Sequence, residues 1–340
     1  MSEQKPPAAY KVDDQELLLG FYKKLVWNRL VPRIPASITP NTLTVIGQAT
    51  AVLAAITCIT AATGGYPILY VVTAILLFSY LTFDNIDGAH ARRTGQCSQL
   101  GEFLDHGLDG MASGAVLIVT AFVLQLDGMM MTLLCGIGAL GFTMLFWEQF
   151  RTGLLVIPKV SSTEGVTLLI IFLTLLAVAG EPRWLEFSMT SVTPGTIIVL
   201  VVLTGYIAAC VPPVLRAKKL GVRPWELIPL AAVIGAQVAF TGLGAMAILP
   251  SIAAGLIGAD VTCRLIILRH RGESGPFLSP SHWLASLPVL VPAFFPGVWT
   301  ATGWSAISLG MVVLSYGMNL WRGSNELLRP APQPQRVLSP

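Results

Sequence analysis

The chain alternates between long apolar runs and short polar segments. A bilayer core of roughly 30 Å requires about 20 apolar residues in a helix, so each such run predicts a membrane span. We expect ten spans, near residues 41–63, 67–88, 105–126, 130–152, 165–180, 195–215, 226–248, 250–268, 281–296 and 301–321. The pattern predicts an all-α, polytopic integral membrane protein.

Basic residues mark one side of the predicted membrane. With ten spans, every Lys and Arg except Arg183 falls on the same side, in segments 5–33, 92–93, 151–159, 216–223, 264–271 and 322–336. Lys and Arg concentrate in cytoplasmic loops of multispanning proteins. Both termini are therefore predicted to be cytoplasmic, at the endoplasmic reticulum or Golgi in a eukaryote and at the inner membrane in a bacterium.

The segment before the first span is amphipathic. Residues 13–33 place apolar side chains at helical spacing between lysines and an arginine: Leu17, Leu18, Phe21, Leu25, Val26 and Leu30. This pattern predicts a helix that lies along the membrane interface and contacts the lipid bilayer. No apolar core of a secretory signal peptide precedes it, so we expect none.

Composition narrows the class of protein further. Only 11% of the 340 residues are charged and 54% are hydrophobic, with a mean hydropathy of +0.71. A soluble domain carries roughly 25% charged residues, so a water-soluble globule is excluded. The net charge of +3 is too small to indicate nucleic acid as a partner. The five cysteines have no metal or redox spacing and predict no disulfide framework.

Acidic residues gather between the second and third predicted spans. Segment 84–92 reads DNIDGAHAR and segment 101–109 reads GEFLDHGLD. Asp84 and Asp87 are three residues apart, and Asp105 and Asp109 are four apart, so each pair shares one helical face. Two helices are thus predicted to present four carboxylates to one space.

Four carboxylates at a membrane boundary need a cation to neutralise them. Oxygen ligands favour a hard ion such as Mg²⁺ or Mn²⁺ over zinc, and four aspartates suit two ions that clamp phosphoryl oxygens. Gly88 and Gly101 at the helix ends let a substrate approach the backbone, or are simply turn residues. The alternative for the acids is a solvated loop with helix-capping carboxylates.

These segments resemble a known family. They match the signature Asp-x-x-Asp-Gly-x-x-Ala-Arg-x8-Gly-x3-Asp-x3-Asp of the CDP-alcohol phosphotransferases at Asp84, Asp87, Gly88, Ala91, Arg92, Gly101, Asp105 and Asp109. The resemblance implies a two-metal site for the diphosphate of a CDP-linked donor, with all four aspartates as metal ligands. It also implies that Gly88, Ala91 and Arg92 lie near the nucleotide. Arg93 is interpreted as a topology anchor.

Further motifs are similar to the choline and ethanolamine phosphotransferases. They are LGEFLDHG at 100–107, PNTLT at 40–44, WEQFRTG at 147–153 and TEG at 163–165. The resemblance implies CDP-choline or CDP-ethanolamine as donor, diacylglycerol as acceptor, and a homodimer. Ala89 and His90 depart from the usual Lys-Gln, which leaves the headgroup open. The implied domains are an N-terminus at 1–36, catalytic helices at 37–220, C-terminal spans at 221–325 and a disordered tail at 326–340.

The resemblance implies transfer of the phospho-headgroup from the CDP-linked donor to the hydroxyl of diacylglycerol. This reaction needs a base to activate the lipid hydroxyl. His106 is the first candidate, with Glu102 one turn earlier on the same face, where it orients or acidifies the imidazole environment. Glu102 or Asp109 is the alternative base. Asn41 and Thr44 either contact the cytidine or ribose, or only follow the helix cap formed by Thr39 and Pro40.

Several other polar residues have two interpretations. Glu164 fits a capping box with Ser161 better than catalysis. Four residues, Trp147, Glu148, Tyr80 and Phe83, are candidate headgroup contacts for a quaternary ammonium group. The alternative is that the aromatic residues among them are interfacial anchors at the span ends. Asp260 and Arg264 are expected to form an internal ion pair, and His270 and His282 to lie in loops.

Two other functions remain open from the sequence. One is a phosphatidyltransferase that uses CDP-diacylglycerol and a soluble alcohol, although such relatives have fewer spans and the His106 motif argues against it. The other is a cation-coupled transporter, for which inverted repeats are expected and none is visible.

Overall fold

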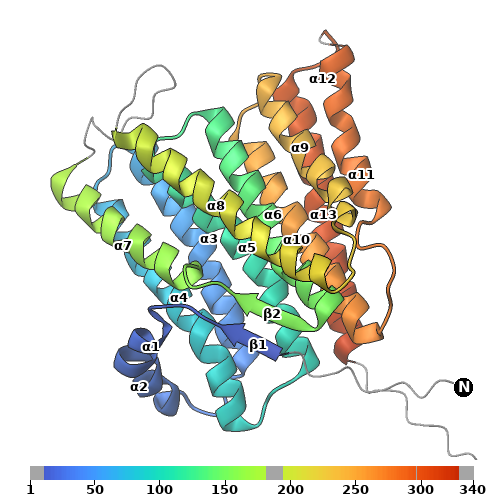
Figure 1. The fold of residues 1–340 in the computed structure, drawn as a ribbon. Helices are drawn as coiled ribbons and strands as arrows, with labels where there is room; N and C mark the ends of the chain where they lie inside the picture. The colour runs from blue at the N-terminus through green and yellow to red at the C-terminus, as the bar shows by residue number, and fades with distance from the viewer. Residues whose placement is uncertain (1–10, 181–193, 296, 329–340) are drawn as a thin grey trace, which may run out of the picture.

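The computed structural model describes residues 11–180, 194–295 and 297–328. Long helices form a bundle, with a small sheet and short N-terminal helices at one end (Figure 1). The helices of the bundle are α3 (Pro40–Gly64), α4 (Ile68–Thr94), α5 (Gln99–Val123), α6 (Gly128–Thr152), α7 (Ser162–Ala179), α8 (Pro194–Lys219), α9 (Ile228–Gly242), α10 (Ile248–Arg271), α11 (Pro280–Ser286), α12 (Leu290–Phe294) and α13 (Ala301–Leu328).

In the part of the chain that the structure describes, eight of the ten predicted spans are helices long and apolar enough to cross a membrane: α3 to α8, α9 together with the preceding 3-10 turn η4 (Pro224–Leu227), and α10. This confirms the all-α polytopic membrane class. The ninth predicted span is broken into α11, the 3-10 turn η5 (Leu287–Val289) and α12. Pro288 and Pro292 lie in this stretch and lack the backbone N–H that a continuous helix needs. The tenth, α13, has 28 residues but does not reach the same apolar content.

Local sequence signals set the helix boundaries. Thr39 caps α3 by accepting a hydrogen bond from the Thr42 N–H at 3.2 Å, with Pro40 in the first turn. Ser98 caps α5 in the same way through the Gly101 N–H at 2.9 Å. The capping box of Ser161 and Glu164 opens α7, so the prediction for Glu164 is confirmed.

The N-terminal segment differs from the prediction. Residues 11–14 form strand β1 (Lys11–Asp14), which pairs in parallel with β2 (Leu154–Ile157), so the helix predicted from residue 13 is wrong there. Glu16 then accepts hydrogen bonds from the Thr163 backbone N–H at 3.0 Å and hydroxyl at 2.8 Å, and its partial burial raises the pKa of its carboxyl. The strand and Glu16 tie the N-terminus to the start of α7.

Helical structure begins at residue 19, with α1 (Leu19–Tyr22), the π-helical turn η1 (Lys23–Trp27), α2 (Asn28–Leu30) and η2 (Val31–Arg33). Tyr22 and Trp27 stack 5.3 Å apart and are buried against the bundle. The exposed apolar side chains of this region include Leu17, Phe21, Leu25 and Leu30. An exposed apolar set beside lysines is the surface expected of an interfacial segment.

Of the predicted tail 326–340, residues 326–328 belong to α13, so the predicted disorder is wrong there. Residues 329–340 and Arg183 lie outside the described residues.

Helices α5 and α10 approach each other at backbone distance in the interior. A Cβ atom placed on Gly110 would lie 2.6 Å from the Cα atom of Ala259, and one on Gly114 would lie 3.4 Å from the Cα atom of Gly255. Small residues at such crossings let helices in a membrane pack by close van der Waals contact. This contact fixes the position of the helix that carries Asp105 and Asp109.

We predict that Gly110→Ala destabilises the protein. Because the backbone of α10 must move to admit the methyl group, the expected loss is about 1–3 kcal/mol and should appear as a lower melting temperature in detergent. Gly205→Ala on α8 is the matched control, since no atom beyond the local backbone of its own helix lies within 4 Å of that Cβ position. Equal melting temperatures for the two variants would contradict the packing argument.

Candidate active site

The hairpin of α4 and α5 brings the predicted acidic residues together. Helix α4 is capped by Gly95, which adopts a left-handed conformation (φ 69°), and α5 begins four residues later. Asp84 and Asp87 therefore lie in the last turns of α4, while Asp105 and Asp109 lie in the first turns of α5. We name these four residues and His106 the acidic site.

Helix α3 contributes hydrogen-bond donors to both helices of the hairpin. The Thr44 hydroxyl donates to Oδ2 of Asp87 at 2.5 Å, and the Gln48 amide donates to Oδ1 of Asp109 at 2.8 Å. Asp84 of α4 and Asp109 of α5 are close enough for their carboxyl groups to interact electrostatically. The acids of α4 thus face those of α5, as the spacing predicts.

The donor set fits a divalent cation. Asp105, His106 and Asp109 each offer a ligand atom, and these atoms all lie within 4.8 Å of one another. Nδ1 of His106 is 3.6 Å from Oδ2 of Asp109 and 3.9 Å from Oδ2 of Asp105. Oδ1 of Asp84 is buried and has no hydrogen-bond partner. A buried carboxylate oxygen without a partner is costly unless a cation offsets it.

The tight group differs from the predicted ligand set. It contains Asp105 and Asp109 but adds His106, whereas Asp84 and Asp87 lie outside it on the facing helix. The sequence signature names the aspartates only.

Glu102 is engaged by α10. Its carboxylate forms an ion pair with Arg269, and its Oε2 lies 3.3 Å from Nε2 of His270. His270 is in the last turn of α10, so its prediction as a loop residue is wrong. The Glu102 carboxylate is thus already occupied by two side chains of α10. This arrangement favours His106 over Glu102 as the base.

The residues predicted near the nucleotide lie around the same helix ends. Oδ1 of Asn41 is 3.3 Å from the Cβ position of Gly101, and Nη1 of Arg92 is 3.4 Å from that of Gly88. Ala91 is buried in the last turns of α4. Thr44 contacts Asp87 directly, so the first span reaches the acidic site as well as capping itself.

His90, the departure from the family motif, is part of the scaffold. It is fully buried, and its Nε2 lies 2.8 Å from the carbonyl oxygen of Ile38. Arg93 donates to Nδ1 of His90 at 3.0 Å and to the carbonyl oxygen of Ile34 at 2.5 Å. These bonds hold the loop before α3 against the end of α4. The sequence offered no signal for this contact, because the partners are backbone atoms more than 50 residues away.

The predicted headgroup contacts are largely occupied by other partners. Trp147 is fully buried, and the Glu148 carboxylate accepts two hydrogen bonds from Arg216 at 2.5 and 2.7 Å. Tyr80 is buried and Phe83 is half-buried. The aromatic ring beside His106 is instead Phe146, at 5.1 Å between centroids, followed by Phe142. Their spacing of four on α6 is the sequence signal that was missed.

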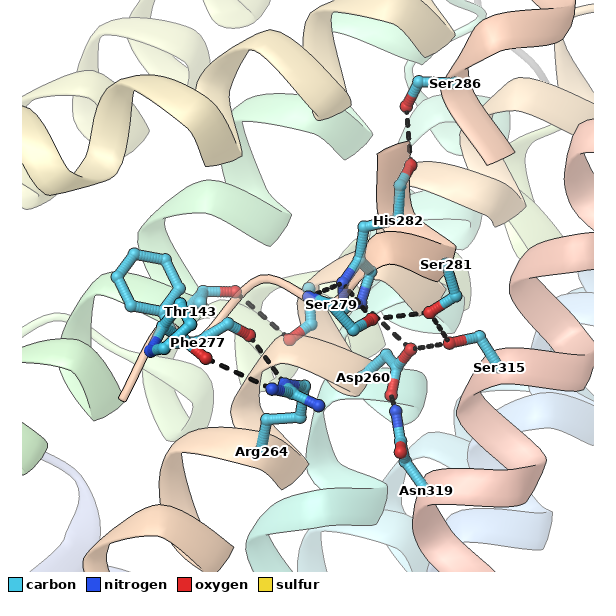
Figure 2. A network of polar contacts seen from close by, with 12 residues as sticks. Thr143, Asp260, Arg264, Phe277, Ser279, Ser281, His282, Ser286, Ser315 and Asn319 are labelled. Atoms are coloured by element: carbon cyan, nitrogen blue, oxygen red, sulfur yellow. Dashed lines mark hydrogen bonds and ion pairs between the residues drawn. The ribbon is translucent and has the colours of Figure 1, made fainter. Parts of the chain in front are cut away.

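The predicted Asp260–Arg264 ion pair is wrong. Arg264 donates to the carbonyl oxygens of Phe277 and Pro276, at 3.0 and 3.1 Å. Asp260 instead lies 3.0 Å from His282, which is buried in α11 and not in a loop (Figure 2). Two residues one turn apart on a helix need not pair when a neighbouring element supplies better-placed partners.

Comparison with known proteins supplies the family. The model of the CDP-alcohol phosphatidyltransferase family matches residues 37–207. An uncharacterized CDP-alcohol phosphatidyltransferase class-I family protein of Schizosaccharomyces pombe is 35% identical over 188 residues, which are 53% of this chain and 49% of that protein. Cholinephosphotransferase 1 of Xenopus laevis is 31% identical over 194 residues (55% and 48%), and that of Homo sapiens is 32% identical over 167 residues (47% and 41%).

The matched region thus spans about half the length of these curated relatives. The region matched by the family model, residues 37–207, contains α3 to α7 and half of α8, and with them every residue of the acidic site. The motif, the hairpin that presents it and the family match agree, and the chain belongs to the CDP-alcohol phosphatidyltransferase family.

Proposed function

We propose that this protein is a metal-dependent phosphotransferase that moves phosphocholine or phosphoethanolamine from a CDP-alcohol to diacylglycerol. The oxygen of the lipid hydroxyl would form a bond with the phosphorus that bears the headgroup, and the bond from that phosphorus to CMP would break. The products are a phospholipid and CMP. The observation that carries the proposal is the acidic site, with a buried, unpartnered oxygen on Asp84 and an imidazole among its carboxylates.

The residues divide the work by position. Asp84, Asp87, Asp105 and Asp109 would hold Mg²⁺ or Mn²⁺, in a site for two ions. Bound there, the metal supplies charge stabilisation for the diphosphate. Asn41, Gly88, Gly101 and Arg92 surround the helix ends where the nucleotide would lie. His106 would accept the proton of the attacking hydroxyl, since its imidazole borders the carboxylates.

The site would open to the cytoplasmic side. The acidic site lies at the end of α4 that carries Arg92 and Arg93, which is the basic side of the predicted topology. A CDP-linked donor is water-soluble and would enter from that side, while diacylglycerol would come from the bilayer. A homodimer remains a prediction.

A donor competition assay tests the reaction class. Purified protein with Mg²⁺ receives labelled CDP-choline, CDP-ethanolamine or CDP-diacylglycerol, each with candidate acceptors. We expect CMP release and labelled phospholipid with one of the first two donors and diacylglycerol. If turnover occurs only with CDP-diacylglycerol and a soluble alcohol, the phosphatidyltransferase alternative is selected. If no donor yields CMP, an enzyme of this class is excluded.

His106→Ala should lower turnover by about 10²–10⁴-fold, the usual contribution of a general base. Binding of the CDP-alcohol, measured by calorimetry on the same preparation, should change little because the aspartates are intact. His106→Gln keeps a polar side chain of similar size and should be similarly inactive. Turnover near that of the wild type in either variant would remove His106 from the mechanism.

Asp84→Asn should separate charge repulsion from metal binding. In EDTA the variant should melt at or above the wild-type temperature, since one of two facing carboxylates is neutral. Saturating Mn²⁺ should stabilise the wild type, by about 2.7 kcal/mol at a hundred times the dissociation constant, and the variant much less. Asp13→Asn on the exposed strand β1 is the control; an equal gain with Mn²⁺ in all three proteins would contradict the metal assignment.

A further inference from the structure

A second cluster of buried polar side chains lies among α10, α11 and α13. Its centre is Asp260 on α10, which is completely buried (Figure 2). Its carboxylate is contacted by His282 of α11 and by Ser315 and Asn319 of α13. The cluster lies outside the region matched by the family model and takes no part in the chemistry proposed above.

The orientation of His282 is fixed by the start of α11. The backbone N–H of Ser279 donates to Nδ1 of His282 at 2.9 Å, so this nitrogen is an acceptor. In a neutral ring the proton then belongs to Nε2, which lies 3.0 Å from Oδ2 of Asp260. Ser279 is the N-cap of α11, and its Oγ also lies 2.9 Å from Nδ1 of His282. These contacts hold the imidazole of His282 between Ser279 and Asp260.

Asp260 in turn fixes α13. Ser315 donates to its Oδ2 and Asn319 to its Oδ1, both at 2.6 Å. These two donors are four residues apart on one helical face, and Tyr316 lies between them in the chain. Rotation or sliding of α13 would break both bonds to a buried carboxylate, which carries a large penalty.

Tyr316 connects this cluster to the acidic site. Its hydroxyl donates to the carbonyl oxygen of Gly107 on α5 at 3.0 Å, and its side chain is buried. Gly107 follows His106 and lies two residues from both Asp105 and Asp109. On the same side Cys263 of α10 approaches, because a Cβ atom on Gly107 would lie 2.9 Å from its Sγ atom. The turn of α5 that carries three groups of the acidic site is thus held from α10 and α13 together.

We propose that Tyr316 is a positioning residue for the acidic site, held in place by the Asp260–His282 cluster. It touches neither metal nor substrate in the proposed function, on which this inference rests. The hydrogen bond from its hydroxyl to Gly107 fixes the position of this turn of α5 relative to α4. It thereby sets the distance between the Asp105–His106–Asp109 group and the aspartates of α4. The C-terminal helices would in this way determine metal affinity at a site built from the N-terminal half.

Tyr316→Phe tests the proposal, because it removes the hydroxyl and leaves the ring. Ser305→Ala is the matched control: Ser305 is also fully buried on α13, but its hydroxyl bonds only to Thr302 on its own helix. Asn319→Ala, which weakens the hold of Asp260 on α13, is the second variant. The full chain is measured in detergent for melting temperature, Mn²⁺ affinity by electron paramagnetic resonance, and backbone hydrogen exchange of peptides that cover residues 103–113.

Tyr316→Phe is expected to bind Mn²⁺ roughly fivefold more weakly, the size of one buried hydrogen bond, and to exchange faster in residues 103–113. Asn319→Ala should shift both quantities in the same direction, and the double variant should show less than the product of the two because both act through one contact. Ser305→Ala should leave both unchanged at a comparable melting temperature.

Unchanged exchange and unchanged Mn²⁺ affinity in Tyr316→Phe would overturn the proposal, as would an equal effect in Ser305→Ala. If Tyr316→Phe does not fold, the same comparison of Asn319→Ala with Ser305→Ala decides. A wild-type protein that binds no Mn²⁺ would refute the proposed metal site; exchange in residues 103–113 would then show separately whether Tyr316 holds α5.

Discussion

Carboxylates placed on facing helices inside a membrane protein impose the main constraint on this structure. Like charges at such distances repel, and burial removes the water that would screen them. The chain meets the constraint with neutral donors from α3, where Thr44 and Gln48 each bond to one of the acids. The neighbouring Glu102 is instead compensated by Arg269 and His270 of α10. The acidic site is therefore supported from both sides of the α4–α5 hairpin.

The predicted domain boundary at residue 220 is a division along the sequence. It does not separate two independently packed parts, because α10 supports the acidic site. The family match ends at residue 207, yet α10 begins at Ile248 and packs against α5 at backbone distance through Gly110 and Ala259. Glycine and alanine at the crossing leave no space for repacking. A change in α10 is consequently transmitted to α5 as a shift of the helix, since no flexible side chain lies between them to absorb it.

Features specified by neighbouring residues could be predicted from the sequence. The caps at Thr39 and Ser161, the apolar length of α3 to α10 and the spacing of the four aspartates each depend on residues within one or two turns. Features specified by distant partners could not. Strand β1 exists because residues 154–157 lie beside it, and four residues carry too little pattern to indicate a strand alone. Likewise, Asp260 and Arg264 have the spacing of an ion pair, and only the placement of α11 and α13 shows that each has other partners.

Hydrogen bonding separates structural carboxylates from the candidate site. Asp260 has donors on both oxygens, and Glu148 receives both of its hydrogen bonds from Arg216. Among the residues that the structure describes, Asp84 is the only carboxylate with a buried oxygen that lacks a partner. If the acids of α4 and α5 only stabilised the fold, a donor would be expected there as it is at Asp260, because an orphaned charge destabilises the bundle. The unpaired oxygen is better explained by a ligand that carries positive charge, and this distinguishes the acidic site from every other buried carboxylate described in the chain.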